Sequence, residues 1–193
     1  LEQQSFDLAN LYFSAVGFVD EDVLEALNVM LLTTDTSPLG EYSNAMNQMK
    51  AAFRYHFMGD KAKTHALNLD PELSRLPSDP QLTLMCLLLH ESDIATSAGL
   101  TYEMTKHETT IFMSELRDDE AYPEQIIDFL NQICQKRMLS DAAQRLYASN
   151  LARVYALAEQ DVRDGNHPFP SAQHSDFMLA GTAGGAQGSK SIN

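Results

Sequence analysis

The chain has 193 residues and carries 27 acidic against 13 basic side chains, with a net charge of −14 and a pI near 4.6. This length is enough to bury a hydrophobic core in one domain without disulfides or a structural metal. A strongly negative surface repels nucleic acid and anionic membranes, so we expect neither as a partner. The acidity itself has two explanations, solubility or attraction of a basic partner, and both stay open.

The two cysteines indicate a reducing compartment. Cys86 and Cys134 lie in apolar runs without C-x-x-C spacing, and we expect both to be buried free thiols. The N-terminus shows no basic segment followed by an apolar one, and no apolar run approaches the ~20 residues that span a bilayer. We therefore expect a cytoplasmic protein that does not insert into membranes.

Apolar residues recur at three- and four-residue steps along the first third of the chain, which predicts helices. The first helix is expected over residues 5–16, and the second over residues 20–32 with Asp20 as its N-cap. A third helix is expected to begin at Ser37-Pro38 and to end at Gly59, because a capping residue followed by proline is a typical helix start.

Helical spacing continues to about residue 162. A short helix is expected after Asp70-Pro71, followed by longer ones over residues 79–99, 101–117, 123–134 and 140–162. The helix over 79–99 is apolar on nearly every face as far as Leu89, so we expect it to be central. The last helix is expected to bury Leu146, Tyr147, Leu151, Val154, Tyr155 and Ala158.

These elements predict an all-α fold. We expect a single-domain helical bundle of about seven main helices over residues 1–165, because no stretch shows the alternation typical of strands. Residues 166–193 are rich in Gly, Ala and Ser, and we expect them to form a flexible tail that builds no core.

Two His-Glu pairs, His90-Glu91 and His107-Glu108, resemble the start of the zinc-protease motif H-E-x-x-H. That motif needs a second histidine one helical turn on, and Ile94 and Ile111 stand there instead. If the helices on either side of Gly99 formed an antiparallel hairpin, the two His-Glu pairs would lie at a similar level along the helix axes. A metal cluster of His90, Glu91, Glu103, His107 and Glu108 is therefore an alternative, although the E-x-x-H spacing of di-iron bundles is missing.

No other motif indicates catalysis. The chain has no nucleophile elbow, no phosphate-binding glycine loop and no cysteine in a polar setting. We therefore predict a non-enzymatic protein that has neither cofactor nor bound metal.

Several segments carry a family resemblance. The opening FDLANLYFSAVGFVDEDVLEAL, the segment FRYHFMG over residues 53–59, and the later IIDFLNQICQ and QRLYASNLARVYALAEQD are similar to the TorD/DmsD/NarJ family of maturation chaperones for molybdenum-cofactor enzymes. Ala98-Gly99-Leu100 precedes Glu103 and His107, which match the Glu and His of the family's E-P-x-D-H signature. Met104 and Lys106 stand where that signature has proline and aspartate.

The resemblance implies a chaperone that binds the twin-arginine signal peptide, or another terminal segment, of a redox enzyme. An acidic helical surface complements the guanidinium groups and the apolar run of such a peptide. The partner would then be a protein with a basic or apolar segment, and a homodimer stays open. The residues expected to contact the peptide are Glu91, Asp93, Tyr102, Glu103, Met104 and His107.

Two alternatives remain. An adaptor or secretion chaperone of another system would share the acidity but would not depend on Glu103 and His107. A metal-dependent helical enzyme would instead use the histidine and carboxylate cluster about Gly99.

Overall fold

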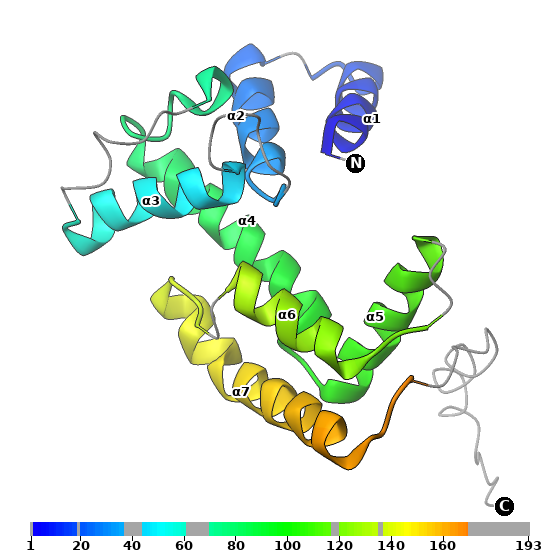
Figure 1. The fold of residues 1–193 in the computed structure, drawn as a ribbon. Helices are drawn as coiled ribbons and strands as arrows, with labels where there is room; N and C mark the ends of the chain where they lie inside the picture. Colours follow the sequence, from blue (N-terminus) through cyan, green and yellow to red (C-terminus); the bar gives the residue numbers. More distant parts are fainter. Residues whose placement is uncertain are drawn as a thin grey trace, which may run out of the picture.

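A computed structural model describes residues 2–18, 20–36, 44–60, 70–116, 120–134 and 137–169 of the chain. These residues form seven α-helices and one 3₁₀ turn, with no strand among them (Figure 1). The all-α prediction is confirmed. The helices are α1 (Glu2–Ala15), α2 (Glu21–Leu32), α3 (Ala45–Met58), α4 (Pro80–Ala98), α5 (Tyr102–Glu115), α6 (Pro123–Ile133) and α7 (Asp141–Asp164), and the 3₁₀ turn is η2 (Pro71–Leu73).

Side-chain caps set the helix starts. Asp20 accepts a hydrogen bond from the Val23 N–H at 3.2 Å, and Asp79 accepts one from the Leu82 N–H at 2.9 Å, as the sequence predicts for α2 and α4. The predicted start of the third helix was wrong. α3 begins at Ala45, because Asn44 accepts from the backbone N–H three residues on at 2.9 Å. The segment over 37–43 lies outside the described residues.

Two hydrophobic clusters form the core, and α4 contributes to both. The N-terminal half of α4 packs with α2, α3 and η2, whereas its C-terminal half packs with α5, α6 and α7. Figure 1 shows α4 running from one group of helices to the other. The predicted central position of this helix is therefore confirmed. Cys86 and Cys134 are buried free thiols, also as predicted.

One residue of the predicted buried face of α7 is exposed instead. Leu151, Val154 and Ala158 are buried, but Leu146 is 65% exposed. At 100° per residue, Leu146 points about 140° away from Leu151 around the helix axis. Because α7 packs on α4, α5 and α6 through the Leu151 side, Leu146 faces solvent.

The packed chain extends beyond the predicted domain end at Gly165. Phe169 is only 7% exposed, and its backbone N–H donates to the Ala121 carbonyl at 2.7 Å. Its ring meets the edge of Tyr102, with centroids 6.5 Å apart. Phe169 lies four residues after Gly165, the C-cap of α7, and still packs on the helices. The prediction missed this contact because it followed the Gly, Ala and Ser content of the residues beyond. Residues 170–193 lie outside the described part.

Candidate functional site

An apolar groove lies between α1, α2 and α4. It has a volume of about 480 Å³, and we call it the α1–α2–α4 groove. Val23, Ala26, Leu27 and Met30 line it from α2 at the helical spacing that puts them on one face. The remaining lining residues are Phe13, Asp22, Arg75, Asp79, Gln81, Leu82 and Met85.

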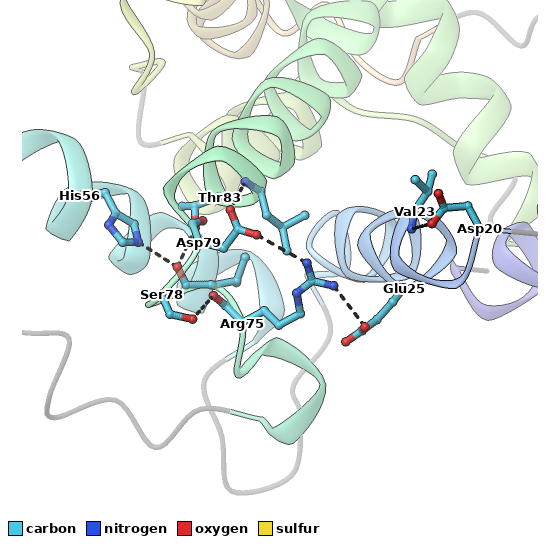
Figure 2. A network of polar contacts seen from close by, with 10 residues as sticks. Asp20, Val23, Glu25, His56, Arg75, Ser78, Asp79 and Thr83 are labelled. Carbon is cyan, nitrogen blue, oxygen red and sulfur yellow. Dashed lines mark hydrogen bonds and ion pairs between the residues drawn. The ribbon is translucent and has the colours of Figure 1, made fainter.

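A network of polar contacts holds the floor of this groove in place (Figure 2). The Arg75 guanidinium lies between two carboxylates, at 3.1 Å from Glu25 of α2 and 3.5 Å from Asp79, the N-cap of α4. His56 and Thr83 both contact the Leu76 carbonyl at 2.8 Å. These contacts join α2, α3 and α4 through the turn that carries Arg75, so the groove has a preformed wall.

The groove has an acidic edge. Arg75 is its only basic lining residue among the described ones. Arg75 pairs with two carboxylates, so the three side chains together carry a net negative charge. The first 49 residues of the chain contain eight acidic residues and no lysine or arginine. The eight are Glu2, Asp7, Asp20, Glu21, Asp22, Glu25, Asp35 and Glu41.

Helix α1 presents apolar side chains to solvent beside the groove. Leu8, Leu11 and Tyr12 of α1, and Val16 directly after it, are each between 60% and 69% exposed, whereas Phe13 of the helix lines the groove. The main contacts of α1 are with α2, and one partner helix covers only one side of a helix whose apolar residues, from Phe6 to Ala15, spread over more than half of its circumference. Contiguous apolar exposure of this kind marks interaction sites in folded proteins.

Glu91, predicted to contact a peptide, is buried at 3% exposure. Its carboxylate accepts hydrogen bonds from the backbone N–H groups of Leu139 and Ser140, the latter at 3.1 and 3.3 Å. Ser140 is the N-cap of α7 and accepts from the Ala143 N–H at 3.1 Å. Glu91 therefore fixes the start of α7 against α4, and it offers no surface to a partner.

Tyr102, a second predicted contact, is also buried. Its hydroxyl donates to the Asp161 carboxylate at 2.7 Å, and burial together with that bond raises the pKa of Tyr102 far above its ordinary value. Burial would raise the pKa of Asp161, but hydrogen bonds from Tyr102 and Asn166 and the nearby Lys106 charge outweigh it and lower this pKa. Tyr102 therefore joins α5 to the end of α7.

The other four predicted contacts lie nearer the surface. Asp93 is exposed on α4, and Glu103 is exposed on α5, where it pairs with Lys106 at 3.0 Å. Met104 and His107 are half-buried on α5. Because two of the six predicted residues are enclosed in the body, the six do not share one continuous surface.

The alternative metal cluster about Gly99 does not form. His90 is 2% exposed, and its Nε2 atom has no hydrogen-bond partner in the described structure. Across the described ranges, no group of three or more His, Cys, Asp or Glu side chains is placed to hold a metal ion. Among the same residues, none of the helices combines the length and the apolarity that crossing a membrane requires.

Comparison with known proteins gives no relative. No family model, no curated protein and no solved structure matches this chain.

Sequence reasoning missed the α1–α2–α4 groove. Two signals in the sequence point to this part of the chain, namely the lack of basic residues before Lys50 and the apolar residues that cover more than half of the circumference of the first helix. The spatial pairing of Val23 with Met85, 62 residues apart, needed the tertiary structure.

Proposed function

We propose that this protein is a non-enzymatic chaperone or adaptor that holds a basic, amphipathic segment of a partner protein in the α1–α2–α4 groove. The observation that carries the proposal is an apolar groove that is lined also by Asp22 and Asp79 and lies beside exposed apolar residues of α1. The sequence before Lys50 contains eight acidic residues and no basic one.

The chemistry of the groove selects the kind of segment. The apolar side of an incoming helix or strand would bury itself on Val23, Leu27 and Met85. Each apolar side chain fully buried in this way contributes about 1.5–3 kcal/mol. Basic side chains beside it would reach Asp22 and Glu21, which are exposed on the first turn of α2. Methionine side chains adapt to different apolar shapes, which suits a protein that binds a flexible segment.

The resemblance to redox-enzyme chaperones supports a more specific form of this proposal. A twin-arginine signal peptide has two adjacent guanidinium groups followed by an apolar run, and this pattern matches an acidic edge next to an apolar groove. Such peptides are recognised before export, in the cytoplasm. The buried thiols of Cys86 and Cys134 fit that reducing compartment.

Peptide titration tests the proposal. A fluorescent peptide with two arginines followed by an apolar run should bind the wild-type chain, and replacing both arginines by glutamine should weaken it. Met85→Glu should reduce binding at least tenfold, because it places a charge in the apolar wall. Leu146→Glu is the matched control, since Leu146 is an exposed apolar residue on α7.

The same titration separates the groove from the site expected on α5. If the Glu103→Ala, His107→Ala double variant lost binding while Met85→Glu kept it, the groove assignment would be wrong. If neither the wild type nor any variant bound the peptide, the twin-arginine form of the proposal would be rejected.

A further inference from the structure

A second cavity has the opposite charge. It lies between α3 and the end of α6, has a volume of about 310 Å³, and we call it the α3–α6 cavity. Among the residues that the structure describes, three cations line it, Lys50, Arg54 and Arg137, and no acidic residue does. The chain has only 13 lysines and arginines against 27 acidic residues. Three cations around one cavity are therefore unexpected in this protein.

Within the described part of the chain, these cations form no ion pair with a carboxylate. The ion pairs among the described residues join Arg75, Lys106 and Arg163 to neighbouring carboxylates, and none of them includes Lys50, Arg54 or Arg137. Arg54 is half-buried on α3, and Arg137 is exposed in the segment before α7. Guanidinium groups in this situation are free to donate to an incoming anion.

Lys50 is the most unusual of the three, because it is only 8% exposed. Its ammonium group donates to the Ile133 carbonyl at the C-terminal end of α6. A helix end carries only about half an elementary charge, so this contact does not neutralise a buried cation. An ammonium group has three N–H donors, and this contact uses one of them.

The surroundings of Lys50 make its charge costly without a counter-ion. Burial is the largest influence and lowers the pKa of Lys50 to about 8; Cys134 raises it, Arg54 lowers it, and Glu91 raises it. His90 faces the same ammonium, which lowers the pKa of this histidine as well. Buried charges in proteins are normally paired, and an anion in the cavity would add a second negative charge to that of Glu91.

We propose that the α3–α6 cavity binds the phosphate group of a small phosphate ester through Lys50, Arg54 and Arg137. Arginine forks match phosphate oxygens in a bidentate manner, and lysine adds a compact charge. The amides of Asn47 and Gln132 line the same cavity and supply further donors. At about 30 Å³ per water molecule, the cavity holds more than a bare phosphate ion, which has five heavy atoms. Ile133 and Leu139 would contact the organic part.

Isothermal titration calorimetry at pH 7.5 tests this site on the full chain. Three probes are used at constant ionic strength: glycerol 3-phosphate, inorganic phosphate and citrate. Glycerol 3-phosphate is expected to bind saturably and more tightly than inorganic phosphate. The Arg54→Gln, Arg137→Gln double variant keeps the buried lysine and should lose at least tenfold in affinity.

The Arg145→Gln, Arg153→Gln double variant is the matched control. Both arginines are exposed on α7, and removing them changes the net charge by the same amount. This control should bind like the wild type. Two outcomes would overturn the proposal: no saturable binding of either phosphate, whether or not citrate binds, or equal weakening in the two double variants. Binding of inorganic phosphate without the ester would overturn the assignment to an ester.

Discussion

Acid sensitivity is expected from one buried histidine. His90 is 2% exposed, and burial, followed by the nearby Lys50 charge, lowers its pKa from 6.5 to about 3. Between these two values the unfolded chain binds a proton that the folded chain does not. The stability that the neutral imidazole contributes is therefore complete above pH 6.5 and is lost as the pH falls from 6.5 toward 3.

The magnitude follows from proton linkage. From pH 6.5 to pH 5 the difference of 1.5 pH units corresponds to about 2 kcal/mol of unfolding free energy, at 1.36 kcal/mol per unit. This figure needs only that the folded pKa lies below about 4. A loss of that size is a large fraction of the ~5–15 kcal/mol that stabilises an ordinary domain.

The test compares wild type with His90→Leu, which removes the titrating group. Urea unfolding followed by circular dichroism gives the unfolding free energy at pH 7.5 and pH 5. The wild type should lose about 2 kcal/mol more than His90→Leu between these pH values. Any cavity that the leucine leaves changes the unfolding free energy by the same amount at both pH values, so it cancels in the difference between them.

His167→Asn serves as the control, because His167 is exposed and its loss changes the histidine count in the same way. It should follow the wild-type pH dependence. If wild type and His90→Leu lost the same stability on acidification, His90 would not be a neutral buried histidine, and the packing around α4 described above would be incorrect.

Three further predictions concern the buried polar groups. Glu91→Ala should lower the unfolding free energy by about 3 kcal/mol, because buried backbone N–H groups ahead of α7 lose their acceptor. Glu103→Ala, at an exposed carboxylate, is the control and should lower it by less than about 0.5 kcal/mol in the same urea titration. Tyr102→Phe should cost about 1 kcal/mol through the lost bond to Asp161, and an unchanged urea midpoint would contradict that bond. Lys50→Met tests the lowered pKa of the lysine, because the folded chain holds fewer protons than the unfolded chain from pH 8 to 10.5. The unfolding free energy of the wild type should therefore rise by about 2 kcal/mol relative to this variant between pH 7.5 and pH 9.5. A constant difference between the two proteins would refute the shift.

Local chemistry accounts for what was predictable from the sequence. Asp20 and Asp79 cap their helices through N–H groups three residues away, so the signal and its consequence lie in the same short segment. Helical spacing of apolar residues identified the all-α class and the central position of α4. The start of α3 was misjudged because Ser37-Pro38 is a stronger local pattern than Asn44, which is the actual cap.

Surfaces built from distant segments were not predictable. Glu91 and His90 are neighbours in the sequence, but the carboxylate binds N–H groups 48 and 49 residues further on, whereas the imidazole Nε2 finds no partner in the described structure. Composition could not distinguish these roles. The predicted peptide contacts on α4 and α5 shared the same weakness, since burial of a side chain depends on what packs over it.

By itself, the sequence determined the helical class, the net charge and the apolar runs that hold both cysteines, because these depend on residues close together in the chain or on composition alone. Only the tertiary structure decided that α2 and α4 form an apolar groove, that α1 leaves its outer side chains exposed, and that Lys50, Arg54 and Arg137 line one cavity. The physical reason is that a cavity is the space left between packed helices. Its lining comes from α3 and from the end of α6, which lie more than 70 residues apart in the sequence.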